Sequence, residues 1–275
     1  MITSTFTITS WACEHHDFFF QKDLETFITS QKNFIEHQEQ QKESIQKLKL
    51  KTLDMITALL QTFSRNGDSF EFESEDQAFL VQINAIFKGN AFNAIQRYRS
   101  ISIGKDANNL FLLSGAGKAE KITNLKKAKE GYEFISDRVY MSKLAYNTKN
   151  KIRLSFYKVS NDLYICVNQH LQDYGKALKD KGIKNEEKPY GPIYYDLTVD
   201  FYKQMDSEKF QFVSFNIYHG QANETRFQAI NAAKTIGNIL TLGALDSGIT
   251  ALVRKNAEKI WESRKGHFQK IILNN

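Results

Sequence analysis

The greatest density of reactive side chains lies in the segment WACEHHD, residues 11–17. A thiol near a helix start can have a lowered pKa, and a neighbouring histidine can hold the thiolate as an ion pair. Cys13 and His16 have this spacing, and His170 and His219, each at the end of an expected strand, are more distant partners. The pattern indicates nucleophilic catalysis. The alternative is a half-buried cysteine beside surface histidines.

The same segment also contains side chains that can bind a metal ion. Its candidate ligands are His15, His16, Asp17 and His37. Adjacent histidines point in different directions on a strand or a helix, and the sequence has no CxxC, HExxH or acidic calcium loop. We therefore expect neither a metal nor a cofactor.

A second candidate is LFLLSGAGKAEK, residues 110–121, where a strand meets a small-residue turn. Backbone N–H groups in such a turn can hold a phosphate. The segment resembles a Walker A loop but has Leu112 in place of the first glycine and Ala119 in place of the Ser or Thr. We therefore do not expect an NTPase. The alternatives are a solvated basic helix or an anion site made by Gly115, Gly117, Lys118, Lys121, Lys126 and Lys127.

Two sets of carboxylates remain. One crowds a single short segment, with Glu71, Glu73, Glu75 and Asp76. The other consists of Asp196 and Asp200, which share a face of one expected strand about 13 Å apart, too far for one acid–base pair. Both sets are interpreted as solvent-facing positions of half-buried strands.

Composition indicates a folded protein of ordinary polarity, with 41% hydrophobic and 25% charged residues. The 21 Phe and 12 Tyr predict a phenylalanine-rich core or an apolar cavity. Two cysteines form no disulfide framework, and the sequence begins without a secretory signal. We expect a protein made in the cytoplasm, with secretion that needs no signal left open.

Charge is distributed unevenly along the chain. Residues 1–100 hold 10 basic and 13 acidic residues, a net charge of −3, whereas residues 101–275 carry +9. Such asymmetry favours an anionic partner for the second part. No helix-turn-helix, zinc finger or ribonucleoprotein motif occurs, so sequence-specific binding of nucleic acid is not expected.

The first element expected to position these residues is a strand over residues 2–11. Over residues 18–63, apolar residues recur with the alternating spacing of three and four that is typical of a heptad helix. This second stretch is either one long amphipathic helix or two helices hinged near 36–44, and an intramolecular hairpin or packing onto a sheet is favoured over a coiled-coil dimer. The spacing is interrupted by Gln31, Gln38 and Gln41. We expect this glutamine-rich middle to face solvent and a partner.

Further along the chain, Ser74 and Gln77 form a capping box that predicts a helix over 75–99, after a short strand at 69–73. Strands are then expected at 100–103 and 109–114, and a lysine-rich helix at 117–129.

The clearest strand pattern lies between residues 132 and 218, where apolar and polar residues alternate. It predicts a three-stranded meander up to residue 170 and a hairpin of 195–201 with 210–218. A charged segment at 176–188 is expected to form a surface helix and loop. A helix from about 223 to 266 closes the chain, and its middle is too polar for a transmembrane span.

The predicted fold class is therefore α+β, with a helical N-terminal part followed by a mainly antiparallel sheet covered by a long C-terminal helix. We expect two domains, residues 1–99 and residues 100–275. The alternative is one continuous domain. A sheet followed by a long helix resembles helix-grip folds, which hold apolar ligands between the two. The resemblance lies in element order alone, and no motif assigns a family.

The function expected first is a non-catalytic binding or interaction protein, such as a bacterial effector or accessory protein. Its partner would be a protein, or else an anionic ligand or a membrane surface. The second hypothesis is a cysteine-dependent hydrolase or acyltransferase that uses Cys13 with a remote histidine. The third is a membrane-active toxin whose C-terminal helix inserts into the bilayer.

Overall fold

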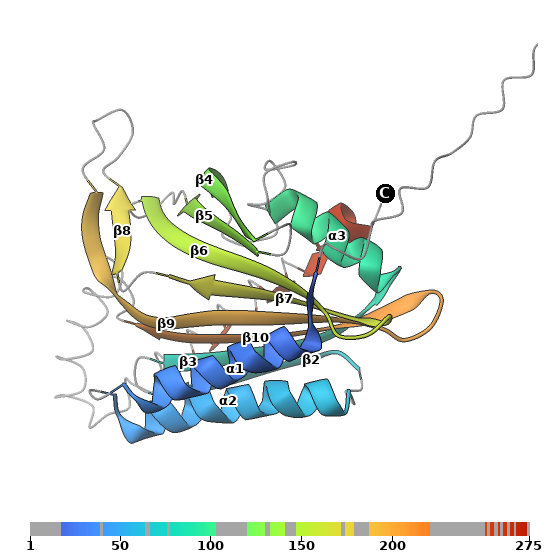
Figure 1. Cartoon of the computed structure of the whole chain (residues 1–275), viewed down its shortest axis with the longest axis horizontal. Coiled ribbons are helices and arrows are strands. Elements are labelled where there is room, and N and C mark those ends of the chain that lie inside the picture. Colours follow the sequence, from blue (N-terminus) through green and yellow to red (C-terminus); the bar gives the residue numbers. More distant parts are fainter. Residues whose placement is uncertain are drawn as a thin grey trace, which may run out of the picture.

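A ten-stranded sheet organises the chain (Figure 1). Its main path runs in the order β2-β3-β10-β9-β7-β6-β5-β4, and β1 and β8 pair beside this path. Neighbouring strands are antiparallel, except that β1 pairs with β6 in parallel. The computed structural model describes residues 18–38, 41–63, 67–75, 78–102, 120–129, 133–140, 147–171, 174–178, 187–220 and, near the end, 251, 254–255, 258, 261–262, 265–266 and 268–273.

The strands are β1 (Phe19–Phe20), β2 (Ser69–Glu75), β3 (Ala78–Lys88), β4 (Glu120–Lys129), β5 (Glu133–Tyr140), β6 (Asn147–Lys158), β7 (Leu163–His170), β8 (Tyr174–Leu178), β9 (Glu187–Gln204) and β10 (Lys209–Gly220). The helices are α1 (Gln21–Glu36), α2 (Glu43–Gln61), α3 (Ala91–Ser102) and the π-helix η3 (Gln269–Leu273).

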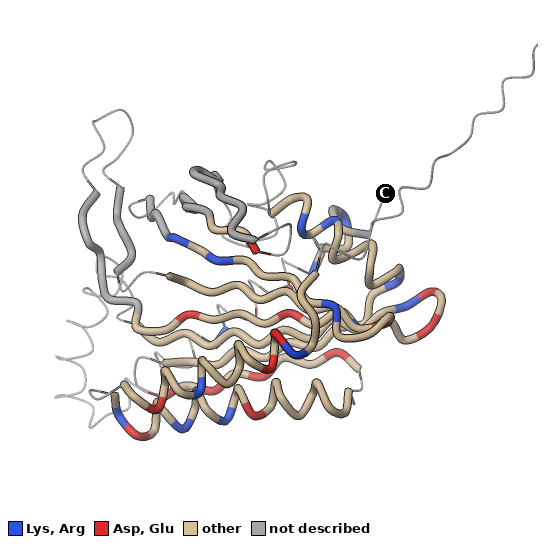
Figure 2. Tube along the Cα trace, in the orientation of Figure 1, with Lys and Arg blue, Asp and Glu red and all other residues tan. Residues whose placement is uncertain are grey.

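Helices pack on both faces of the sheet. In Figure 1, α1 and α2 lie below it and α3 lies above it. The face below buries apolar side chains against Leu24 of α1 and Ile56 of α2. The face above buries an aromatic cluster against Ile95 of α3, together with Trp261 and Phe268 from the end of the chain. Charged residues gather on the helices and turns, whereas the central strands carry few (Figure 2).

Several sequence predictions are confirmed. The meander is present as β5, β6 and β7, and the hairpin as β9 and β10. The helical stretch is two helices that pack on each other and are joined inside the predicted hinge, rather than one long helix. The sheet is antiparallel, as the alternation indicated.

The arrangement predicted around the sheet is wrong. No long C-terminal helix covering the sheet is seen among the described residues, and positions 221–250 lie outside them. The observed cover is α1 and α2 on one face and α3 with η3 on the other. The N-terminal part is also not simply helical, because β2 and β3 join the same sheet through β10.

The helix predicted over 75–99 is wrong as well. Its first part is β3, and only α3 is helical. Nearly every side chain of β3 is buried, so its apolar residues do not alternate cleanly with polar ones. A strand that is buried on both faces appears in the sequence as a continuous run of apolar residues. The spacing of apolar residues alone cannot distinguish such a strand from a buried helix.

Three shorter predictions also differ from the structure. Residues 100–102 end α3 instead of forming a strand, and 120–129 form strand β4 instead of a lysine-rich helix. Residues 174–178 form strand β8 where a surface helix was expected. The strands expected at 2–11 and 109–114 lie outside the described residues.

Within the described part of the chain, no helix has the length and apolar character needed to cross a membrane. The apolar stretch expected at 236–250 lies outside that part.

Candidate functional site

The two faces of the central strands differ sharply in composition. Over β7, β9 and β10, the face beneath α1 and α2 is apolar and buried at its centre, with Val167, Leu197, Val199, Phe201, Val213, Phe215 and Ile217. Successive side chains of a strand point to opposite faces. The face toward α3 therefore carries the alternating residues, which include Asn168, Thr198, Asp200, Ser214 and Asn216. We call these five residues the polar rows.

The pairing register aligns the polar rows across three neighbouring strands. Asp200 pairs with Ser214, and Thr198 pairs with both Asn168 and Asn216. Asp200 and Ser214 are each only 7% exposed. Asn168, Thr198 and Asn216 are half-buried, so this continuous patch of hydrogen-bonding groups is fully buried only at Asp200 and Ser214.

Hydrogen bonds tie the rows to a further carboxylate at Asp196. The Asn216 Nδ2 group donates to Thr198 Oγ1 at 2.8 Å and to Asp196 Oδ1 at 3.4 Å. Burial raises the pKa of Asp196 to about 6, and the bond from Asn216 opposes this rise only in part. The carboxyl group of Asp196 therefore keeps its proton to a higher pH than an ordinary aspartate does.

A small cavity opens beside the polar rows. Its volume is about 70 Å³, and it is lined by Ile83, Tyr98, Asn168, Thr198, Asp200, Tyr202, Phe212, Ser214, Trp261 and Phe268. The rings form a connected wall, because the Phe212 centroid lies 5.2 Å from Tyr202, 5.3 Å from Phe268 and 6.3 Å from Trp261. The cavity therefore has an aromatic side and a hydrogen-bonding side.

This arrangement matches the general composition of small-molecule sites. Such sites are mostly apolar and have a few convergent polar groups that fix orientation. The polar rows offer carboxylate, amide and hydroxyl oxygens that accept hydrogen bonds, and amide and hydroxyl groups that donate them. Among the described residues, no group of three His, Cys, Asp or Glu side chains could hold a metal ion.

A second buried polar cluster lies under the α1–α2 hairpin. Lys49 of α2 is fully buried, and its Nζ donates to Gln38 Oε1 at 3.2 Å and to Gln41 Oε1. The ammonium group also lies 5.0 Å from the ring centroid of Tyr195. Burial lowers the pKa of Lys49 to about 7. The cluster joins the connection between the two helices to β9.

The expected solvent-facing role of the glutamines is wrong. Gln31 is 8% exposed, and its Oε1 accepts bonds from Tyr195 Oη at 3.2 Å and Gln169 Nε2 at 3.3 Å. Gln38 and Gln41 likewise direct their carbonyl oxygens at Lys49. These residues interrupt the apolar spacing because they complete a buried polar network.

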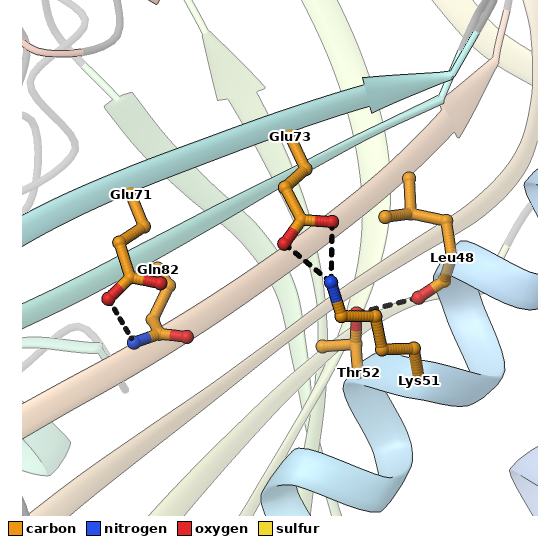
Figure 3. A network of polar contacts seen from close by, with 6 residues as sticks. All are labelled: Leu48, Lys51, Thr52, Glu71, Glu73 and Gln82. Atoms are coloured by element: carbon orange, nitrogen blue, oxygen red, sulfur yellow. Dashed lines mark hydrogen bonds and ion pairs between the residues drawn. The ribbon is translucent and has the colours of Figure 1, made fainter.

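A groove of about 830 Å³ separates α2 from strand β2. Its apolar lining comes mainly from α2, and Glu73 and Glu75 of β2 lie along it. Lys51 spans the groove, since its Nζ lies 2.7 and 2.9 Å from the two carboxylate oxygens of Glu73 (Figure 3). Gln82 Nε2 donates to Glu71 Oε1 at 3.2 Å in the same network.

The proposed catalytic residues are only partly placed. Cys13 and His16 lie outside the described residues, so the catalytic hypothesis stays a prediction. His170 ends β7, and His219 pairs with Tyr195 of β9 near the end of β10. Both histidines lie at the same end of the sheet on strands with β9 between them, a backbone separation of about 10 Å. His219 also contacts Tyr194, with ring centroids 4.7 Å apart.

The proposed anion site is divided in the same way. Gly115, Gly117 and Lys118 lie outside the described residues. Lys121, Lys126 and Lys127 belong to strand β4, where Lys121 pairs with Val139 and Lys126 with Ile135. Their role in binding an anion stays a prediction, although the helix that was to carry them is a strand.

Sequence reasoning missed the polar rows. The interpretation of Asp200 as solvent-facing is wrong, because it is buried between two other strands. The sequence did show that apolar and polar residues alternate along β9 and β10. The structure adds that these strands lie in the middle of the sheet. Alternation predicts that one face differs from the other, but it does not reveal whether the polar face meets water.

Several solved structures are similar to this chain in fold, with TM-scores below 0.5. Human StAR-related lipid transfer protein 5 has a TM-score of 0.43 at 7% identity, covering 90% of this chain and 97% of its own. The Zhui aromatase/cyclase from Streptomyces sp. R1128 has a TM-score of 0.40 at 8% identity, covering 70% and 94%. Truncated norcoclaurine synthase from Thalictrum flavum has a TM-score of 0.36 at 13% identity, covering 77% and 99%.

No family model matches the sequence, and no curated protein matches it. These similarities are too low to assign a family or an activity, so the function has to be inferred from the residues of this chain.

Proposed function

We propose that this chain is a binding protein for a small, largely apolar molecule that carries a hydrogen-bonding group. The ligand would lie between the polar rows and the aromatic side chains of Phe212, Trp261 and Phe268. The observation that supports this proposal is the contrast between the two faces of β7, β9 and β10. One face is wholly apolar at its centre, and the other carries five polar residues beside a cavity.

The free energy of burying polar side chains favours a functional role for the polar face. A buried polar group without a hydrogen bond destabilises the protein by about 1–3 kcal/mol, whereas an apolar residue in the same place stabilises it. The helix-covered face shows that these strands can be apolar where only packing is required. Thr198 and Asn216 are partners of each other on the other face, and a bound ligand or water would supply further partners to the polar residues there.

The size of the cavity sets a condition on binding. At about 70 Å³ it has room for about two water molecules, each of which takes about 30 Å³ in the liquid. An organic ligand must displace this water and move the side chains above it. Trp261 and Phe268 come from the end of the chain, outside the sheet, and are the side chains that would move.

Tryptophan fluorescence tests the proposal directly. The chain has two tryptophans, so Trp11→Phe leaves Trp261 as the sole reporter, at the cavity. The probes are 2-naphthol and 2-methylnaphthalene, which differ only by a hydroxyl in place of a methyl group. We expect 2-naphthol to quench Trp261 in a saturable way and to bind more tightly than 2-methylnaphthalene.

Variants of the polar rows should remove this preference. One hydrogen bond contributes about 1 kcal/mol, so Thr198→Val and Ser214→Ala should each reduce the preference for 2-naphthol by roughly fivefold. Thr57→Val on α2 is the matched control and should leave both affinities unchanged. Absence of saturable quenching by either probe, or an equal loss in the control, would contradict the proposal.

A further inference from the structure

The two edges of the sheet carry opposite charges. Among the described strands, β2 pairs with β3 alone and β4 pairs with β5 alone, so these two strands end the sheet. Strand β2 contains three glutamates and no basic residue. Strand β4 contains four lysines and one glutamate. The charge asymmetry along the sequence thus places acidic and basic segments at opposite ends of one sheet.

The acidic edge has the features of a strand acceptor. Glu71, Glu73 and Glu75 alternate along β2, so they share one face of the strand. The apolar groove beside α2 runs along this face. Lys51 shows how a lysine is held here, with its ammonium group on the carboxylate of Glu73 (Figure 3). A long lysine side chain can lay its apolar stem along such a groove while its head meets a carboxylate.

Like edges cannot pair favourably. Two β2 strands side by side would bring glutamates opposite glutamates, and two β4 strands would bring lysines together. Like charges directly opposite each other destabilise a strand pair, whereas opposite charges stabilise it. Edge charges of this kind protect a sheet against symmetric aggregation. They leave one favourable combination, β2 with β4.

We propose that β2 of one molecule pairs with β4 of a second copy of this chain, so that the sheets continue head to tail. Such a contact uses different surfaces on the two copies, and it therefore forms a ring if the rotation closes and an open chain if it does not. The contact is independent of the cavity, which lies on the central strands.

Ionic strength tests the proposal with the unmodified protein. Exposed charges are screened over about 10 Å at 0.1 M salt and about 3 Å at 1 M. Sedimentation equilibrium at about 0.02 M NaCl should show a mass that rises with concentration, and about 1 M NaCl should restore single chains. Single chains at every concentration in low salt would overturn the proposal, and so would association that salt strengthens.

Charge reversal identifies the two edges. We expect Glu71→Lys with Glu75→Lys, and separately Lys121→Glu with Lys127→Glu, to abolish association in low salt. Mixing the two reversed proteins should restore it, because each then meets an edge of opposite charge. Glu36→Lys with Glu208→Lys is the control, since both glutamates are exposed and lie outside β2 and β4.

The mixture also controls for misfolding, because damaged proteins do not complement each other. Association that persists in either reversed protein alone, or a mixture that remains as single chains, would overturn the pairing of β2 with β4. An equal loss in the control would do so too, since it would make the effect one of net charge.

Discussion

Lys49 is the most unusual residue of the described structure. Its side chain is fully buried, and its neighbours include the amide oxygens of Gln38 and Gln41 and the ring of Tyr195. Tyr195 is the titratable group that faces it, and burial raises the pKa of that phenol. A buried ammonium group is normally paired with a carboxylate. Lys49 is held by neutral groups instead, which explains why burial lowers its pKa to about 7.

This environment predicts a pH dependence of stability. The pKa of Lys49 is about 7 in the folded protein and about 10.5 in the unfolded chain, so the unfolded chain binds more protons between these values. The free energy of unfolding should therefore rise with pH from about 7 to about 10.5, by roughly 5 kcal/mol for this group. Urea unfolding of Lys49→Met should show this rise removed. Lys47→Met, an exposed lysine on the same helix, should retain it, and equal slopes in the two variants would contradict the assignment.

Asp196 predicts the opposite slope in a lower range. Its pKa is about 6 when folded and about 3.9 when unfolded, so the folded protein keeps a proton that the unfolded chain releases. Stability should fall by roughly 3 kcal/mol as pH rises from about 4 to about 6. Asp196→Asn keeps an oxygen for Asn216 and should remove this fall in urea unfolding at the two pH values. Asp54→Asn on the surface of α2 is the control, and an unchanged fall in Asp196→Asn would show that another group titrates.

At the level of elements, the passage from β3 to α3 is where sequence reasoning failed and where the backbone is most constrained. Gly89 joins the two and has φ of +131°. Its N–H donates to Glu208 O at 2.7 Å, and Gln204 Nε2 donates to its carbonyl oxygen at 3.3 Å. The glycine thus ties this turn to the β9–β10 hairpin. The predicted helix ran straight through a position that requires glycine.

Gly89→Ala should therefore destabilise the protein. A side chain at this φ costs about 1–3 kcal/mol, which lowers the midpoint of thermal unfolding by several degrees. Gly266→Ala is the matched control, because that glycine is helical and an added Cβ meets nothing within 4 Å. It should be neutral or stabilise by up to about 1 kcal/mol. Equal effects of the two substitutions would show that the conformation of Gly89 is not strained by a side chain.

The sequence predicted the strands correctly where apolar and polar residues alternate with a clear period of two residues. The meander and the β9–β10 hairpin have such alternation, and their turns are polar. It failed for β3, which is buried on both faces, and for β4, whose lysines favoured an exposed helix. In both cases the neighbouring strand decided the conformation, and no local pattern reports that neighbour.

At the scale of the whole molecule, the sequence by itself determined that this chain has an antiparallel sheet, helical structure over residues 18–63 and opposite charges in its two parts. It left open whether that helical stretch is one helix or two. These properties follow from side-chain period and composition, which are local. Only the tertiary structure decided that the N-terminal helices cover the sheet and that β2 and β4 form its edges. It also decided that Asp200, Lys49 and Gln31 are buried. Burial and strand order depend on contacts between residues far apart in the chain. Local patterns in a single sequence do not reveal these contacts.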